Sequence, residues 1–304
     1  MLSERNLKDF IKKYNLEATE EELNGIWPTL LEIADDYYTK FNLLNIEANY
    51  IASKLQNIEH VHSVRWRIKS TDHLIKKIIR KKKENNAKYQ NINCTNYLKI
   101  INDSIGLRAL HLFKDEGIEI INNLNKFGKP AEKPVAYIRS GDAGDQIEKY
   151  KRAKLKTEIH KSGYRSIHFI LPITCEIETF CEIQVRTIFE EGWGEIDHKL
   201  RYPDYSDDQI VFSYLLLLNR LAGSADEMGS LAKEIKNHLN EKRIEKENLE
   251  EEVARLKSRI DNKNNVTNHD LDNLLKMVSN INKSTNLNND ALRNYYNIMK
   301  HLRK

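Results

Sequence analysis

The segment that most constrains this chain is residues 180–187, Phe-Cys-Glu-Ile-Gln-Val-Arg-Thr, which leads directly into a helix-like stretch ending near Tyr202. Successive side chains of a strand point to opposite faces, so Ile183 and Val185 share one face of this segment. The other face carries polar groups about 7 Å apart: Glu182, Gln184 and Arg186. A strand built only for packing has no need of such a face, so the segment predicts a site.

The composition narrows the class of protein. The chain has 304 residues, enough for a large core, and its sequence has no apolar run of the length that spans a membrane. Its 3 cysteines form no C-x-x-C pair, which argues against a zinc site or a disulfide framework. We therefore expect a cytoplasmic protein with reduced cysteines.

The formal net charge of +4 is modest, but the basic residues are clustered. Within residues 65–83 the only acid is Asp72, and the rest of the charged side chains are Lys or Arg. A second cluster comprises Lys149, Lys151, Arg152, Lys154, Lys156 and Lys161. Both clusters suit a polyphosphate ligand.

Hydrophobic periodicity predicts an α+β fold. We expect a helical lead-in over 1–60, strands at 64–68, 105–113 and 135–138, and helices at 71–83 and 117–127. Residues 140–145 and 149–161 are interpreted as loops. Strands at 164–171 and 177–187, joined by a turn at Pro172-Ile-Thr, predict a hairpin. Together these elements indicate a mixed sheet flanked by helices.

The C-terminal part, residues 206–304, is expected to be a helical extension of a core at 61–205. Hydrophobic residues of 231–260 fit a and d positions of one heptad frame: Ile235, Leu239, Leu249, Val253, Leu256 and Ile260. Lys242 and Lys246 interrupt that frame. The pattern favours a coiled-coil or helical-hairpin arm, which either forms a homo-oligomer or packs back on the core. The Asn-rich stretches 261–270 and 282–290 are interpreted as linkers.

Four motifs carry candidate chemistry. In Asp103-Ser-Ile-Gly-Leu-Arg108 the carboxylate could hold Mg²⁺ and the arginine could neutralise phosphate oxygens, although Asp103 could equally be a turn residue. In Ser162-Gly-Tyr-Arg-Ser-Ile-His168, Tyr164 could stack on a base or belong to the core.

The other two motifs have similar alternatives. Glu182 could act as a general base for attack on phosphorus, or pair with an arginine. Arg67 and Lys69, followed by Lys76 and Lys77, could surround a nucleotide triphosphate, or form a solvated charged face.

In their order along residues 40–205, these motifs resemble the synthetase domain of the RelA/SpoT family, the alarmone synthetases. The matching patterns are R-x-K with a downstream Lys pair, D-x-x-G-x-R, S-G-Y-R-S-x-H, and E-I-Q-V-R-T followed by W-x-E-I-x-H-x-L-x-Y. The resemblance implies a small alarmone synthetase that lacks hydrolase and regulatory domains, with a nucleotidyltransferase-like sheet. It implies transfer of the pyrophosphate of ATP to the 3′-hydroxyl of GDP or GTP, with Mg²⁺, releasing AMP.

The resemblance also assigns roles. The ATP-binding set is Arg67, Lys69, Lys76, Lys77 and Arg108. Asp103 corresponds to the Mg²⁺ ligand and Glu182 to the acid that activates the 3′-hydroxyl, and we expect both carboxylates at the metal and in catalysis. Tyr164 corresponds to the tyrosine that stacks on the acceptor guanine. The remaining acceptor-site set is Lys161, His168, Gln184, Arg186 and His198.

The match departs from the family in two places. His73 stands where relatives usually carry serine, and His160 stands where they carry a lysine, with Lys161 one position later. Other acceptors therefore stay open: a toxic member of the family would pyrophosphorylate the tRNA 3′ end or make adenosine alarmones. A catalytically inactive nucleotide- or RNA-binding scaffold is the alternative of another class.

Overall fold

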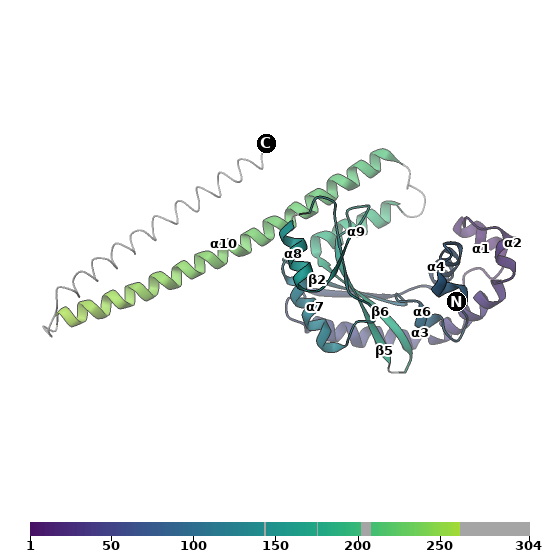
Figure 1. The fold of residues 1–304 in the computed structure, drawn as a ribbon, viewed down its shortest axis with the longest axis horizontal. Coiled ribbons are helices and arrows are strands. Elements are labelled where there is room, and N and C mark those ends of the chain that lie inside the picture. The colour runs from purple at the N-terminus through teal and green to yellow at the C-terminus, as the bar shows by residue number, and fades with distance from the viewer. Residues whose placement is uncertain (143, 175, 202–207, 262–304) are drawn as a thin grey trace. The chain divides into compact units, whose positions relative to one another are not determined.

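The computed structural model describes residues 1–142, 144–174, 176–201 and 208–261. The chain divides into two compact units, Met1–Ser230 and Leu231–Lys304. The first unit contains a sheet with helices on both sides (Figure 1). Helix α10 (Gln209–Asp261) begins in this unit and continues into the second. The linkers expected at 261–270 and 282–290 lie outside the described residues, apart from Asp261.

The sheet has six strands in the order β1-β2-β6-β5-β3-β4. The strands are β1 (Ser63–Ile68), β2 (Ile105–His111), β3 (Val135–Ile138), β4 (Lys156–Ile159), β5 (Ser166–Thr174) and β6 (Glu178–Thr187). Pairs β2/β6 and β3/β4 are parallel, and the other neighbours are antiparallel. The expected mixed sheet flanked by helices, with a helical C-terminal extension, is confirmed.

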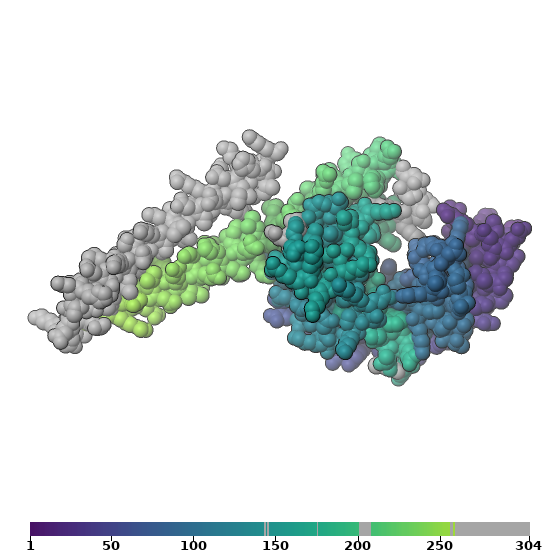
Figure 2. All heavy atoms as spheres, in the orientation of Figure 1, coloured from purple at the N-terminus to yellow at the C-terminus, as the bar shows by residue number. Residues whose placement is uncertain are grey.

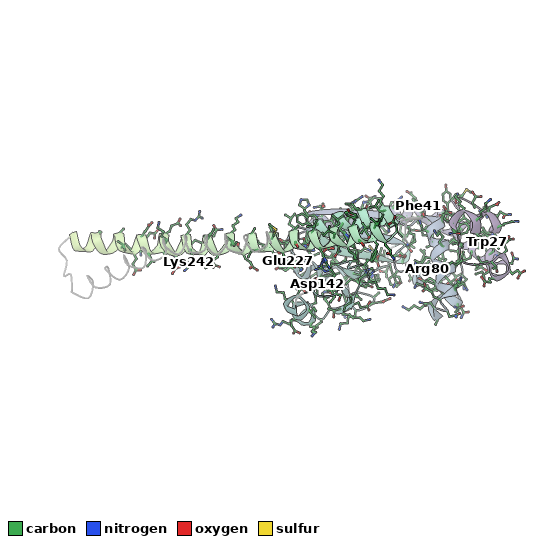
Figure 3. All side chains as sticks on the ribbon, turned by 90° about the horizontal axis from the view of Figure 1, so that it is seen from above. Trp27, Phe41, Arg80, Asp142, Glu227 and Lys242 are labelled. Atoms are coloured by element: carbon green, nitrogen blue, oxygen red, sulfur yellow. The ribbon has the colours of Figure 1, made fainter. Side chains whose placement is uncertain are left out.

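Ten helices accompany the sheet in the described residues. They are α1 (Leu7–Tyr14), α2 (Glu20–Asn24), α3 (Trp27–Gln56), α4 (Thr71–Lys83), α5 (Ala87–Gln90), α6 (Tyr97–Ile100), α7 (Glu116–Phe127), α8 (Gly144–Arg152), α9 (Ile188–Arg201) and α10. In Figure 1, α3 and α7 lie on one side of the sheet and α9 on the other. Figure 3 labels Trp27 at the start of α3 and Arg80 on α4.

Strand register places the polar side chains in rows across one face of the sheet. Arg65, Arg108, Gln184 and His168 are successive partners on β1, β2, β6 and β5. In the next row Gly106 lies between Arg67 and Glu182. The opposite face is apolar and fully buried, with Leu107, Ala109, Ile183, Val185 and Phe169 at most 1% exposed. Burial of that face stabilises the sheet and leaves the polar face for chemistry.

Helix α4 shows how the basic cluster is built. The side chain of Ser70 caps the helix by accepting a hydrogen bond from the His73 N–H at 3.4 Å. Leu74, Ile75, Ile78 and Ile79 recur at helical spacing and are at most 4% exposed. That apolar stripe fixes the rotation of the helix, so its lysines and arginines face outward from the core.

The structure corrects three expectations about boundaries. The turn of the hairpin is not at Pro172-Ile-Thr, because β5 continues to Thr174 and Pro172 pairs with Phe180. Strand β3 pairs with β5 only at Ser166–His168, so Pro172 lies where the far side of β5 is no longer paired and its missing N–H is tolerated. Residues 149–161 are not a loop, since they contain the end of α8 and strand β4. Residues 140–145 likewise include the first residues of α8.

None of the helices in the described parts of the chain is long and apolar enough to cross a membrane.

Candidate active site

A pocket of about 880 Å³ lies at the polar face of the sheet. Its walls come from β1, α4, β2, β6 and α9, together with residues 14–18 after α1. Figure 2 shows the surface hollowed beside the blue segment that contains α4. The lining includes all five cations predicted to bind ATP: Arg67, Lys69, Lys76, Lys77 and Arg108. Asp103, Glu182, Gln184 and His198 line the same pocket, so the structure brings together nine of the predicted site residues.

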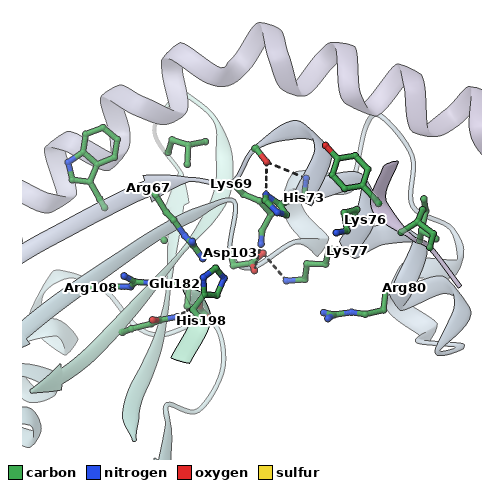
Figure 4. Close-up of a pocket in the computed structure, with 18 of the residues that line it drawn as sticks. Arg67, Lys69, His73, Lys76, Lys77, Arg80, Asp103, Arg108, Glu182 and His198 are labelled. Atoms are coloured by element: carbon green, nitrogen blue, oxygen red, sulfur yellow. Dashed lines mark hydrogen bonds and ion pairs between the residues drawn. The ribbon is translucent and has the colours of Figure 1, made fainter. Parts of the chain in front are cut away.

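Asp103 is held between two lysines. Its Oδ2 lies 2.9 Å from the Lys69 Nζ and its Oδ1 lies 2.7 Å from the Lys77 Nζ (Figure 4). Burial raises the pKa of Asp103, but the two ammonium groups outweigh burial and hold the pKa below its ordinary value. Asp103 is therefore a carboxylate at neutral pH. It lies in the turn before β2, as the alternative interpretation expected, and it is also ion-paired with both lysines.

The backbone behind Asp103 is fixed by a buried tyrosine of α3. Tyr37 has no exposed surface, and its hydroxyl donates to the Lys69 carbonyl at 2.7 Å. The Lys69 N–H in turn donates to the Ser104 carbonyl at 3.0 Å. Burial first, and the charge of Asp103 second, raise the pKa of Tyr37, so the hydroxyl keeps its proton. Tyr37 thus ties together the segments that carry Lys69 and Asp103.

Glu182 is the second carboxylate of the pocket. Its Oε1 lies 3.3 Å from Nδ1 of His168, and its Oε2 accepts a hydrogen bond from Gln184 Nε2 at 2.9 Å. Burial raises the pKa of Glu182, but the interactions with His168 outweigh burial and lower the pKa overall. The charge of Asp103 acts to raise the same pKa, so the two carboxylates are close enough to interact.

Two carboxylates in one pocket fit a magnesium ion. Mg²⁺ is usually held by one or two protein carboxylates together with substrate phosphates and water. The described residues contain no group of three or more His, Cys, Asp or Glu side chains that could hold a metal by themselves. Asp103 and Glu182 are therefore the residues that would hold Mg²⁺ together with a nucleotide.

Tyr164 belongs to an aromatic cluster beside Glu182. Its ring centre lies 5.3 to 6.2 Å from the ring centres of Tyr137, His160 and His168. Its hydroxyl lies 3.1 Å from the His168 Nε2 and donates to the Gln184 Oε1 at 3.4 Å. The guanidinium of Arg186 lies over the Tyr164 ring at 5.4 Å. Tyr164, His168 and Arg186 therefore join the site through Gln184 and Glu182, although they do not line the pocket. Lys161 is exposed and is not among the residues that line the pocket.

Helix α9 supplies acids that the sequence did not single out. Glu191 is buried and pairs with Arg65 at 3.1 Å, with Arg108 at 2.9 Å and with Arg186. Glu195 pairs with Arg108 as well. Two of the predicted site arginines, Arg108 and Arg186, are thus positioned by carboxylates of α9. Their spacing of four residues on a helix was the available signal.

A second buried network lies below the aromatic cluster. Arg165 is contacted by both oxygens of Asp142, at 2.7 and 2.9 Å, and by Glu190 at 2.7 Å. Burial raises the pKa of Glu190 to about 7 and that of Asp226 on α10 to about 6. The ion pair between Arg165 and Glu190 anchors the first turn of α9 to the segment directly before β5, and Asp226 joins α10 to the end of β6 through Thr187.

Comparison with known proteins shows which family model and which relative the chain resembles. Residues 66–207 match the model described as "Region found in RelA / SpoT proteins". The chain is 28% identical over 177 residues to the GTP pyrophosphokinase YwaC of Bacillus subtilis (strain 168), an alignment that covers 56% of this chain and 70% of that protein.

Solved structures give a weaker likeness. The small alarmone synthetase 1 of Bacillus subtilis is 22% identical, with a TM-score of 0.46, over 68% of this chain and 99% of that one. A GTP pyrophosphokinase family protein from Streptococcus pneumoniae is 22% identical, with a TM-score of 0.43, over 73% of this chain and 97% of that one. The family match runs from within β1 to beyond the end of α9 and includes every predicted site residue, so residues 66–207 of this chain are a RelA/SpoT region.

Proposed function

We propose that this chain is a pyrophosphokinase that transfers the pyrophosphate of ATP to the 3′-hydroxyl of GDP or GTP and releases AMP. One observation carries the proposal: Asp103, held between Lys69 and Lys77, shares a pocket with Glu182, which is held by His168 and Gln184. The match of residues 66–207 to the RelA/SpoT region supports it, as does the 28% identical relative named as a GTP pyrophosphokinase.

The donor half of the proposed reaction uses the cations of β1 and α4. Lys69 and Lys77 exchange their ion pairs with Asp103 for the phosphates of ATP, while Arg67 lies on the same wall. When bound, Mg²⁺ would neutralise charge on the transferred phosphates, with Asp103 and Glu182 as its protein ligands. The surrounding positive side chains stabilise the charge that spreads over the phosphoryl oxygens.

The acceptor half uses Glu182 as general base. A carboxylate whose pKa is lowered is ionised at neutral pH, so it can accept the proton of the attacking hydroxyl. His168 and Gln184 hold one oxygen each, which fixes the orientation of the carboxylate. Tyr164 would stack on the acceptor base, and Arg186 and His198 would contact the acceptor phosphates.

The decisive experiment measures AMP formation from ATP and Mg²⁺ with GDP and GTP. We expect AMP and a guanosine product carrying a 3′-pyrophosphate. Glu182→Gln should lower kcat by about 10² to 10⁴ while binding of a non-hydrolysable ATP analogue changes less than about threefold. Glu178→Gln is the matched control, because Glu178 is an exposed acid on the same strand, outside the pocket. Full activity of Glu182→Gln would refute the assigned base.

The same assay should include GMP, adenosine nucleotides and bulk tRNA as acceptors. Five exposed bases of α8, β4 and the residues between them lie shortly before the turn that carries Tyr164: Lys149, Lys151, Arg152, Lys154 and Lys156. A surface of this charge favours nucleic acid. Pyrophosphate found on the tRNA acceptor end, with no free product, would replace GDP and GTP as the proposed acceptors. No AMP with any acceptor would refute the enzyme itself.

A further inference from the structure

The N-terminal part of α10 buries two polar side chains, Asn219 and Asp226, against the proposed acceptor side of the site. Asn219 is 1% exposed and Asp226 is 2% exposed, although both are hydrophilic. A buried polar group is costly unless it is hydrogen-bonded, so each needs a partner in the core. The partner of Asp226 is the hydroxyl of Thr187, at 2.9 Å, next to Arg186. The partner of Asn219 is the turn that carries Tyr164.

Asn219 holds that turn by its backbone. Its Nδ2 donates to the Gly163 carbonyl at 3.0 Å, and its Oδ1 accepts from the Arg139 guanidinium at 3.5 Å. Gly163 has a φ of +75°, and a Cβ at this position would lie 2.9 Å from the Asn219 Oδ1. Glycine is therefore required both by the backbone conformation and by the approach of Asn219.

The next residue, Tyr164, is fixed at both ends as a result. Its hydroxyl is held by His168 and Gln184 on the sheet, and its backbone follows the carbonyl that Asn219 binds. The Gly163 N–H closes the turn on the His160 carbonyl at 3.0 Å. One turn further along α10, Gly223 packs against Arg165, where a Cβ would lie 3.0 Å from the guanidinium. The helix and the turn are thus fitted to each other over several residues.

We propose that Asn219 is a positioning residue for acceptor binding: it sets the turn 160–164, and through it the ring that stacks on the acceptor base. This inference rests on the proposed function and adds to it a residue outside the region matched by the family model. Asn219 itself does not contact the nucleotide. No described residue of α10 lines the pocket with the predicted ATP-binding cations, so the donor side should not depend on Asn219.

The test uses Asn219→Asp in the full chain at pH 8. The aspartate keeps the shape of the side chain and the acceptor for Arg139, but its ionised carboxylate cannot donate to the Gly163 carbonyl. We expect the KM for the acceptor to rise roughly tenfold, the effect of losing one buried hydrogen bond, while the KM for ATP changes less than about twofold. Leu215→Ala is the control, because Leu215 is 2% exposed on the same helix and its loss weakens packing without touching Gly163.

A second measurement is independent of turnover. Hydrogen exchange of the amides at 160–166 should be faster in Asn219→Asp than in the wild type, and unchanged in β1 and β2. Equal rises in both KM values, or unchanged exchange at 160–166, would overturn the inference. Faster exchange with an unchanged acceptor KM would overturn it too, because the turn would then not serve the acceptor. A wild type that makes no AMP would instead refute the proposed function, so the two failures are distinguishable.

Discussion

Removal of the Tyr37 hydroxyl should weaken ATP binding, although Tyr37 does not line the pocket. Tyr37→Phe deletes the group that donates to the Lys69 carbonyl at 2.7 Å, and the ring keeps its place because Tyr37 has no exposed surface. Loss of a buried hydrogen bond that leaves its acceptor unpaired costs about 1 to 2 kcal/mol. For a unit of this size we expect Tm to fall by about 5 °C.

The same change should loosen the segments that carry Lys69 and Asp103. If binding must then supply about 1 kcal/mol to hold these segments in place, the Kd for a non-hydrolysable ATP analogue rises by about fivefold. Tyr97→Phe is the matched control. Tyr97 is 1% exposed, its ring lies 6.2 Å from that of Tyr37, and its hydroxyl donates to the Asp36 carboxylate at 2.8 Å.

Calorimetry of unfolding and of analogue binding on the two variants decides the matter. Both variants should lose stability, but only Tyr37→Phe should bind the analogue more weakly. Equal affinity of the two variants would show that the position of Lys69 does not depend on Tyr37. A large affinity loss in Tyr97→Phe would show that general destabilisation, and not the bond to Lys69, controls the pocket.

Two further predictions concern Gly106 on β2 and the buried acid Glu190 on α9. Gly106→Val should raise the Kd of the ATP analogue at least about tenfold with Tm unchanged or higher, because its methyl groups would stand between Arg67 and Glu182 while valine favours a strand. Gly106→Ala should bind normally, since a Cβ there meets nothing closer than 3.9 Å. Burial raises the pKa of Glu190 from 4.5 to about 7, so the folded protein keeps a proton that the unfolded chain loses. Stability should therefore fall by up to about 3 kcal/mol as pH rises from about 4.5 to 7. Denaturant titrations of Glu190→Gln should show a flatter pH profile, and an unchanged profile would refute the assignment.

The sequence was informative where chemistry and periodicity coincide. Strand β6 alternates strictly, so the shared face of Glu182 and Gln184 could be predicted from spacing alone. Helix α4 has both a cap and an apolar stripe, which fixed its bounds and its basic face. These signals are local, and the structure agrees with them.

The wrong and missed predictions have physical causes as well. Pro172 is a turn signal in most contexts, but here it lies where one side of β5 is unpaired. The lysines of 149–161 obscured a helix and an edge strand, because a charged surface tolerates many conformations. Asn219 sits in an apolar run, Leu215-Leu-Leu-Leu-Asn219, with no neighbour in sequence to reveal its partner. The spacing of Glu191 and Glu195 indicated a helix face, but it could not reveal the partners of Glu191, since its three arginines lie on three different strands.

The rows of side chains across the sheet have a consequence for the newly made chain. Each row takes one residue from each of several strands, and β2 and β6, which lie next to each other, are separated by residues 112–177. A fragment that ends before β6 lacks Glu182, so it cannot bring Arg67, Asp103 and Glu182 together. A chain still on the ribosome therefore lacks the complete pocket until β6 has emerged, so incomplete copies of the protein could not carry out the proposed reaction.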